Sequence, residues 1–446
     1  MNSFDPDKTA GFPPPDAAGA QSLLPNPDRT QMVAPGGYSL ICRPENTALL
    51  ASDAAHNHLL VQWRAEGGPA ASGPRMPLNL ALAIDRSGSM EGEPLQYAQR
   101  ACAQIIDLLE PSDILTIVTF AEDVDVLVPA RRVVNRALLK EHVARITTGN
   151  TTNLHDGILA AANQVASVGA KGYVNRVLVL TDGEPTAGIR DFQSITAQAA
   201  EQRNRGVTVT ALGFGPEYNE ELLAGIARRS GGNYYYIARP ELLPEVFRSE
   251  LVSMMRLAAR NAKLTIRPAK WNRVRQVYGH RLSFTPDGVE VDLADLEQGA
   301  ALTLLAEMDF GPRPTGEYRC ATVEVEFEDA QGGAPQRIAA DAVWTFTSDP
   351  QEAEASLDAG VAAELQVALA SQQLERTLMG MRTQQLDGQT AMLDLQRTQQ
   401  ILASSGRSTQ AAEVTMALDN LRRGDANAAE KTLTGASLNL ERGKTE

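Results

Sequence analysis

Three oxygen-bearing side chains stand close together where an apolar stretch of the chain ends. The stretch LNLALAI, residues 78–84, is followed directly by the pattern Asp85-x-Ser87-x-Ser89. An Asp with hydroxyl groups two and four positions later places three hard oxygen ligands on one tight turn. Such ligands suit Mg²⁺ better than Zn²⁺. The spacing therefore predicts a magnesium site at this turn.

Two further segments carry oxygen ligands. Thr151 and Thr152 lie in the segment TTGNTTNLHDG, and Asp182 directly follows the apolar run VNRVLVLT, residues 174–181. In an open parallel sheet, ligands bind beyond the carboxyl ends of the strands, near the point where the strand order reverses. We therefore expect both segments to lie beside Asp85.

These elements resemble the metal-ion-dependent adhesion site of the von Willebrand factor A (vWA) family, which reads Asp-x-Ser-x-Ser, then a Thr, then an Asp. Asp85, Ser87 and Ser89 match the first part, and Asp182, in Thr-Asp-Gly, matches the last. The three parts occur in the family's order, within residues 76–257. The resemblance implies that these side chains hold a divalent metal.

The threonine of the site is assigned by the same resemblance. The family commonly has a Gly-Gly-Thr-Asn-like segment, and alignment on Asn153 makes Thr152 the ligand. This chain departs from the pattern because Asn150 and Thr151 stand where small glycines are usual. Thr151 therefore stays open as the alternative ligand.

The resemblance implies binding rather than catalysis. With only two carboxylates facing a dication, Mg²⁺ (or Mn²⁺ or Ca²⁺ in its place) keeps affinity for an Asp or Glu of a protein partner. The expected function is a non-enzymatic adhesion or scaffold module. A second hypothesis, also from the family, is an accessory subunit of an AAA+ ATPase machine of the MoxR or chelatase type.

Enzyme alternatives fit the residues less well. A haloacid-dehalogenase-type phosphatase needs a second Asp where Ser87 stands, and a serine hydrolase needs Gly-x-Ser-x-Gly. No GxxxxGK[ST] segment occurs, which excludes a P-loop. His155 is expected to be a surface residue at a helix start. His56 and His58 would share one strand face, but no cluster of other ligands accompanies them, so we expect solvated side chains.

The elements that must position the site alternate between strands and helices. Strands are expected at 78–84, 113–120, 124–128, 174–181, 207–214 and 233–238, with helices between most of them. Continuous apolar runs indicate strands buried on both faces. The pattern predicts an α/β fold, a doubly wound, mostly parallel, Rossmann-like sheet. The short 121–123 connection predicts one antiparallel edge strand.

Strand-like segments stand on both sides of this core. Residues 37–75 contain two, and residues 258–348 contain several with turn residues between them. The first set alone would leave bare sheet edges. Similar flanking strands occur in inter-alpha-trypsin-inhibitor-like heavy chains, so we expect one β-sandwich into which the vWA domain (76–257) is inserted. Residues 349–446 are expected to be helical, with a helical hairpin at Gly424-Asp425 and one or two helices before it.

The first 36 residues are rich in Pro, Gly, Asp and Ala, which predicts a disordered tail. The tail repeats Pro-Asp, a basic residue and Thr, ending at Thr9 and at Thr30. Phosphorylation there would add about -1.5 to -2 charge and strong acceptors. We hypothesise a Ser/Thr kinase and a forkhead-associated domain protein as partners of the tail.

Composition narrows the class of partner and the compartment. The net charge of -14 repels nucleic-acid phosphates and anionic lipid. No segment approaches the roughly 20 apolar residues of a membrane span. The chain opens without the basic and apolar regions of a signal peptide, and its three cysteines show no CxxC spacing. Cytoplasmic localisation is therefore expected.

Overall fold

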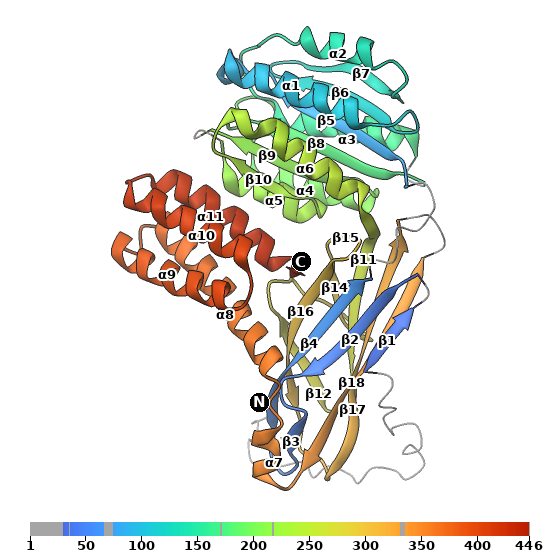
Figure 1. Ribbon diagram of the computed structural model, residues 1–446, viewed down its shortest axis with the longest axis vertical. Coiled ribbons are helices and arrows are strands. Elements are labelled where there is room, and N and C mark those ends of the chain that lie inside the picture. Colours follow the sequence, from blue (N-terminus) through green and yellow to red (C-terminus); the bar gives the residue numbers. More distant parts are fainter. Residues whose placement is uncertain are drawn as a thin grey trace, which may run out of the picture.

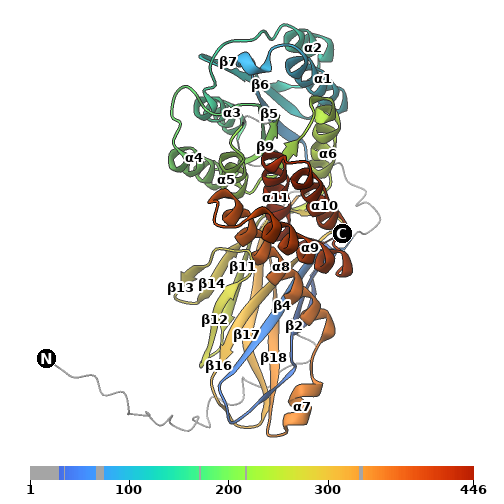
Figure 2. The ribbon, with the colours of Figure 1, turned by 90° about the vertical axis from the view of Figure 1, so that its left-hand side faces the viewer.

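The computed structural model describes residues 30–34, 36–66, 75–169, 172–215, 218–330 and 335–445. An α/β unit and a β-sandwich follow one another along the long axis of the molecule (Figure 1). The C-terminal helices lie beside the junction of these two units, as the perpendicular view shows (Figure 2). The α/β fold, the β-sandwich and the helical region expected from the sequence are all present.

The α/β unit is built on a six-stranded sheet in the order β10-β9-β8-β5-β6-β7. All neighbours in it are parallel except β7, which pairs antiparallel with β6 at the edge, as predicted. Its strands are β5 (Leu78–Asp85), β6 (Ile114–Phe120), β7 (Val124–Arg132), β8 (Val174–Thr181), β9 (Thr208–Phe214) and β10 (Tyr234–Ile237). Every residue of β5, β6 and β8 is buried, which explains why these strands are mostly apolar and do not alternate with polar residues.

Helices cover both faces of this sheet. They are α1 (Glu93–Leu108), α2 (Arg136–Ala144), α3 (Leu154–Val168), α4 (Phe192–Asn204), α5 (Glu220–Ser230) and α6 (Leu243–Met255). One hydrophobic core joins the sheet to α1, α2 and α6, and a second joins it to α3, α4 and α5. Asn135 and Asp191 accept backbone N–H groups at the starts of α2 and α4, which fixes where these helices begin.

The sandwich combines strands from before and after the α/β unit. One sheet runs β1-β2-β4-β16-β12, with β19 also on β16, and the other runs β13-β14-β11-β17-β18-β3, with β15 also on β11. The earlier strands are β1 (Gln31–Ala34), β2 (Tyr38–Pro44), β3 (Ala48–Leu50) and β4 (Ala55–Ala65). The later ones are β11 (Leu257–Pro268), β12 (Asn272–Val277), β13 (Ser283–Thr285), β14 (Gly288–Asp292), β15 (Leu296–Glu297), β16 (Ala301–Phe310), β17 (Gly316–Asp329), β18 (Gln336–Thr347) and β19 (Lys444–Thr445).

One hydrophobic core holds the two sheets together. Trp63 of β4 and Trp344 of β18 are both fully buried in it, although the whole α/β unit separates them in the sequence. The α/β unit is therefore inserted into the sandwich.

The prediction that residues 1–36 are a disordered tail is wrong for their last part. Residues 31–34 form β1, which pairs antiparallel with β2 through a turn in which Gly36 and Gly37 have positive φ angles. Ladder hydrogen bonds to β2 stabilise this strand despite its few large apolar residues. Thr30 is half-buried and its carbonyl accepts the Cys42 N–H at 2.9 Å, whereas Thr9 lies outside the described residues.

The C-terminal region contains α7 (Pro350–Ala355), α8 (Ala359–Arg382), α9 (Gly388–Ser404), α10 (Ser408–Arg422) and α11 (Ala426–Glu441). The predicted hairpin is α10 and α11, with Gly424 at a positive φ between them and Asp425 capping α11. Two long helices and the short α7 precede it. No helix of the described residues is long and apolar enough to cross a membrane.

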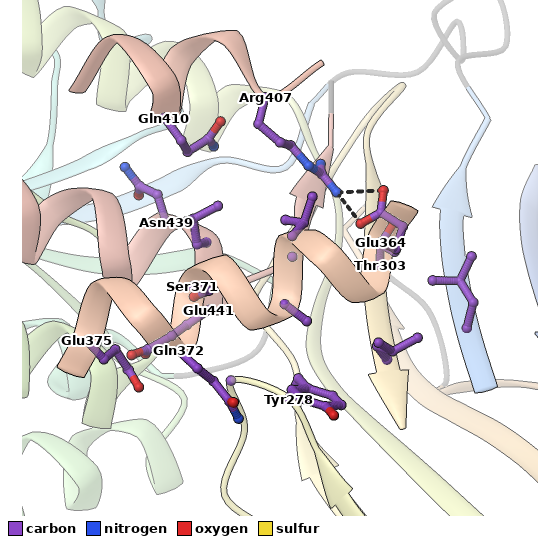
Figure 3. A pocket seen from close by; sticks show the side chains of 17 residues that line it. Tyr278, Thr303, Glu364, Ser371, Gln372, Glu375, Arg407, Gln410, Asn439 and Glu441 are labelled. Carbon is purple, nitrogen blue, oxygen red and sulfur yellow. Dashed lines mark hydrogen bonds and ion pairs between the residues drawn. The ribbon is translucent and has the colours of Figure 1, made fainter. Parts of the chain in front are cut away.

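The helical region contacts both other units. Lys431 of α11 is buried against the α/β unit, where its Nζ donates to the Tyr218 carbonyl at 2.7 Å and to Glu220 at 3.0 Å. At the other end, α8 packs on the sandwich through Val361, which is buried with Leu60 and Leu305. Figure 3 shows the pocket between α8, the hairpin and the sandwich, spanned by the Arg407–Glu364 ion pair at 2.7 Å.

Candidate metal site

The candidate site lies where the strand order of the α/β sheet reverses. The chain leaves β5 to form β6 on one side and later returns to form β8 on the other. Asp85 is the last residue of β5, and Asp182 directly follows β8. Because these strands are parallel neighbours, their carboxyl ends bring the two Asp residues together, as expected.

A chain of hydrogen bonds connects the predicted ligands. The Ser87 N–H donates to Asp85 Oδ1 at 2.8 Å, and the Oγ atoms of Ser87 and Ser89 are 3.2 Å apart. The Ser89 hydroxyl then donates to Asp182 Oδ1 at 2.7 Å. Asp85 and Ser87 are buried and Ser89 is exposed, so the cluster opens to solvent at Ser89.

Thr152 faces the same cluster. A methyl group added at Gly183 would lie 3.6 Å from Ser89 Oγ and 3.7 Å from Thr152 Oγ1. Thr151 Oγ1 is buried and makes no hydrogen bond to the described residues. The structure therefore brings Thr152 together with the serines and Asp182, which supports the assignment made from Asn153.

Two threonines outside the predicted ligand set hold these ligands. The Thr181 hydroxyl donates to Asp85 Oδ2 at 2.5 Å, and Thr186 Oγ1 accepts the Thr152 N–H at 2.8 Å. Thr181 precedes Asp182 in the Thr-Asp-Gly segment. Its position at the end of a predicted strand could have identified it from the sequence. Thr186 had no signal in the sequence, because its contact depends on the folding of the 182–190 loop.

Burial raises the pKa of Asp85 to about 6, and the charge of nearby Asp182 adds to this effect. Hydrogen bonds from Thr181 and Ser87 act in the opposite direction because they favour the ionised carboxylate. Within the described part of the chain, no Lys or Arg forms an ion pair with Asp85. A buried carboxylate without a cationic partner is costly, and a bound cation would offset that cost.

The residues present fit a hard divalent cation. Two carboxylates and the hydroxyls of Ser87, Ser89 and Thr152 form an all-oxygen donor set, which Mg²⁺ prefers. Asp85 and these hydroxyls would hold the ion, and Asp182 would act through Ser89 or water. Such an ion would leave positive charge at the open end of the site and would supply an anchor for an acidic ligand.

His155, the histidine nearest in sequence to the threonine segment, pairs with a carboxylate of its own helix. Its Nδ1 lies 2.8 Å from the carboxylate of the adjacent Asp156, at the start of α3. Asn153 caps that helix. This is the helix-start position expected from the sequence, but the expectation of a surface residue is wrong, because the His155 side chain is only 12% exposed.

Comparison with known proteins agrees with this geometry. Residues 79–249 match the von Willebrand factor type A domain. The chain is 29% identical over 269 residues to protein sll0103 of Synechocystis, covering 58% of this chain and 63% of that protein. It is 33% identical over 239 residues to YfbK of Escherichia coli, and the match covers 52% of this chain and 41% of that protein. Human inter-alpha-trypsin inhibitor heavy chain H4 is 32% identical over 167 residues, and the match covers 35% of this chain and 18% of that protein.

The chain thus spans less than two thirds of the length of each of these relatives. Solved structures are similar over more of the chain. A von Willebrand factor type A protein from Catenulispora acidiphila has a TM-score of 0.68 at 18% identity and covers 86% of this chain and 91% of its own. The ArnB paralog VWA2 from Sulfolobus acidocaldarius has a TM-score of 0.62 at 17% identity, and the match covers 91% of this chain and 98% of that one.

These structural similarities show a shared fold, which extends beyond the α/β unit into the sandwich and the helices. The sequence match over residues 79–249 covers the unit that carries Asp85, Thr152 and Asp182. The chain therefore carries a von Willebrand factor type A domain in residues 79–249, and it is distantly similar to bacterial YfbK and sll0103 and to the inter-alpha-trypsin inhibitor heavy chains.

Proposed function

We propose that this protein is a Mg²⁺-dependent protein-binding module that recognises an acidic residue of its partner through the metal. The observation that carries the proposal is the hydrogen-bonded cluster of Asp85, Ser87, Ser89 and Asp182, open to solvent at Ser89. Its hydroxyl ligands add no negative charge, so the ion retains affinity for a further carboxylate.

The charge of the site makes the metal essential for such recognition. Without a cation, Asp85 and Asp182 would repel an incoming Asp or Glu. The net charge of -14 adds a long-range repulsion that salt weakens. Binding of an acidic partner is therefore expected only when the metal is present.

We further propose that the site catalyses no reaction. The Ser87 and Ser89 hydroxyls contact each other and Asp182, and His155 contacts Asp156. A serine nucleophile would need a base within hydrogen-bond reach. This arrangement supports binding more than group transfer.

The test combines metal titration with partner capture. Isothermal titration with MgCl₂ is expected to show one site in the wild type and none in Asp85→Ala, with unchanged thermal unfolding of the metal-free proteins. Asp123→Ala is the matched control, because this exposed Asp lies on the β6–β7 hairpin. Its hydrogen bond with Ala121 is made by its backbone carbonyl, which the substitution keeps. Equal Mg²⁺ affinity in the wild type and Asp85→Ala would refute the proposal.

Capture from extracts of the native host, with Mg²⁺ or with EDTA, then tests partner binding. Wild-type protein with Mg²⁺ should retain a partner that Asp85→Ala and EDTA-treated protein both lose. An AAA+ ATPase captured in this way would identify the chain as an ATPase accessory subunit. A partner retained equally under all conditions would show that recognition does not use the metal.

A further inference from the structure

A second group of ligand-type side chains lies on the outer face of the sandwich, outside the vWA domain. His56 and His58 project from β4, and Glu307 and Asp309 project from the adjacent strand β16. The register places His58 opposite Glu307 and His56 opposite Asp309. The expectation of a solvated side chain holds for His56, which is exposed, and is wrong for His58, which is buried. The expectation that no other ligands accompany them is also wrong, because the carboxylates come from a distant segment.

Carboxylates hold both imidazole rings by their Nδ1 atoms. His58 Nδ1 lies 2.6 Å from Glu45 Oε2, and His56 Nδ1 lies 3.1 Å from Asp309 Oδ1. A carboxylate can only accept a hydrogen bond, so each Nδ1 carries the proton. In the neutral rings, this leaves the Nε2 lone pairs available. Metal-binding histidines in proteins are oriented in the same way by a carboxylate on the other nitrogen.

The Nε2 side of the two rings meets Glu307. His56 Nε2 is 3.0 Å from Glu307 Oε1, and the Tyr278 hydroxyl lies 3.4 Å from His58 Nε2 and 3.5 Å from Glu307 Oε2. One ligand atom from each of His56, His58 and Glu307 lies within 4.8 Å of the others. At this distance the two atoms are held together either by a proton on His56 Nε2, which would donate a hydrogen bond to Glu307, or by a metal ion that both would bind.

We propose that His56, His58 and Glu307 bind a divalent transition metal ion, Zn²⁺ in the first instance. Two imidazole nitrogens and one carboxylate are a common Zn²⁺ ligand set, with a fourth position left for water. Tetrahedral coordination at about 2.0–2.1 Å needs ligand atoms about 3.3–3.5 Å apart. The ligand atoms lie within 4.8 Å of one another, so binding would require their side chains to rotate closer together. Its nitrogen ligands distinguish it from the all-oxygen vWA site.

A nearby arginine competes for the same carboxylates. The Arg275 guanidinium is 3.4 Å from Glu307 Oε1 and 3.8 Å from Asp309 Oδ2, and Gln276 also donates to Glu307. The Arg275 side chain is 55% exposed, so it can leave into solvent when a metal binds. Its removal should therefore strengthen metal binding, in contrast to removal of any ligand.

The site stands where the helical region leaves the sandwich. The carbonyl of Glu45 accepts the N–H of Asp358 at 2.6 Å, and Asp358 caps α8. The Asp358 carboxylate also pairs with Arg43. A metal held by His58 would therefore be connected to the first turn of α8 through Glu45. Tyr278, beside α8 in Figure 3, links the cluster to the neighbouring pocket.

The experiment uses the full chain carrying Asp85→Ala, so that the vWA site contributes no metal binding. After metal is removed with EDTA and the EDTA is dialysed away, ZnCl₂ is titrated in competition with a chromogenic chelator. One Zn²⁺ per chain is expected. Added His56→Ala or His58→Ala should weaken binding by about 100-fold or more, and Asp309→Asn or Glu45→Gln by about 10- to 100-fold. Added Arg275→Gln should strengthen it by about two- to five-fold.

His142→Ala, a histidine of α2 remote from the cluster, is the matched control and should leave Zn²⁺ affinity unchanged. Because the His56 side chain is 42% exposed, its variant is expected to fold, and near-UV circular dichroism checks this. Co²⁺ in place of Zn²⁺ should give a visible absorption band that His56→Ala removes. Equal Zn²⁺ affinity with and without His56→Ala would overturn the proposal and leave an ion-pair network with Arg275. Failure of the vWA proposal would not affect the comparison of His56→Ala with its parent, because both proteins carry Asp85→Ala.

Discussion

At the scale of single residues, the vWA site depends on side chains that hold one another. Thr181 and Ser87 each occupy one lone pair of the Asp85 carboxylate, so its orientation is set before any metal arrives. Preorganised ligands bind a metal more tightly because less conformational entropy is lost on binding. Loss of a hydroxyl should therefore weaken the metal without unfolding the sheet.

The two adjacent threonines provide a matched pair that tests this. Thr152→Val is expected to weaken Mg²⁺ binding by about 10-fold or more, because it removes an oxygen ligand while the shape of the side chain stays nearly the same. Thr151→Val should leave Mg²⁺ affinity unchanged and stabilise the fold by up to about 1 kcal/mol, because it replaces a buried hydroxyl that lacks a partner. Calorimetric titration and thermal unfolding measure the two effects. The opposite ranking would make Thr151 the ligand.

At the scale of elements, a half-buried acid lies between the two helices of the C-terminal hairpin. Glu413 of α10 accepts from the Asn439 amide of α11 at 3.3 Å, and its other oxygen has no partner among the described residues. Burial raises the pKa of Glu413 from 4.5 to about 7, partly offset by the Asn439 hydrogen bond. Between these two pH values, Glu413 is therefore protonated in the folded chain and ionised in the unfolded chain.

The hairpin is consequently expected to lose stability as pH rises from about 4.5 to 7. Glu413→Gln imitates the protonated acid, so it should match the wild type at pH 4 and exceed it by about 1–2 kcal/mol at pH 8. Hydrogen exchange of α10 and α11 at both pH values measures this. Asp419→Asn, on the same helix but with a side chain that is 48% exposed, should give no such gain. A wild type that is equally protected at both pH values would contradict the prediction.

At the scale of the whole molecule, one buried lysine joins the helical region to the vWA domain. Lys431 is only 1% exposed, and its Nζ lies 4.0 Å from the centre of the Tyr218 ring. Glu220 is shared between Lys431 and Arg382 of α8. These groups orient the helices on α5 because a buried charge is stable only in the one arrangement that pairs it.

Lys431→Met keeps most of the side-chain volume but removes the charge. It is expected to weaken the docking of α11 by about 1–3 kcal/mol, since the Tyr218 carbonyl and Glu220 lose a donor. Limited proteolysis should then release the 349–446 region faster, while exchange protection of β5 and β8 stays unchanged. Lys140→Met, which breaks an exposed pair with Asp107, should have almost no effect. Equal proteolysis rates for Lys431→Met and the wild type would refute this role.

The composite sandwich can be tested by removing its first part. Deletion of residues 30–66 would take Trp63 out of the core and leave β16 without β4, its partner over ten residue pairs. We expect exchange protection to fall across residues 257–347 more than across residues 78–255. Trp63→Ala is a milder variant that should lower protection in the same segments. Unchanged protection of β16 would mean that the later strands are stable alone.

The sequence alone determined the features that depend on local pattern. Buried strands, amphipathic helices and capping residues are set by side-chain period and backbone chemistry within a short window, so the α/β order and the helical hairpin could be predicted. The same holds for the Asp85-x-Ser87-x-Ser89 turn. Asp182 was found because strand ends in a parallel sheet meet at one edge.

Only the tertiary structure decided contacts between distant segments. The register that sets His58 opposite Glu307, the carboxylate on each imidazole, and Lys431 beneath Tyr218 join residues that no local pattern relates. Such contacts depend on loop closure and on the packing of whole sheets, which short-range propensity does not encode. β1 was missed for the same reason, because its stability comes from hydrogen bonds to β2 rather than from its own apolar residues.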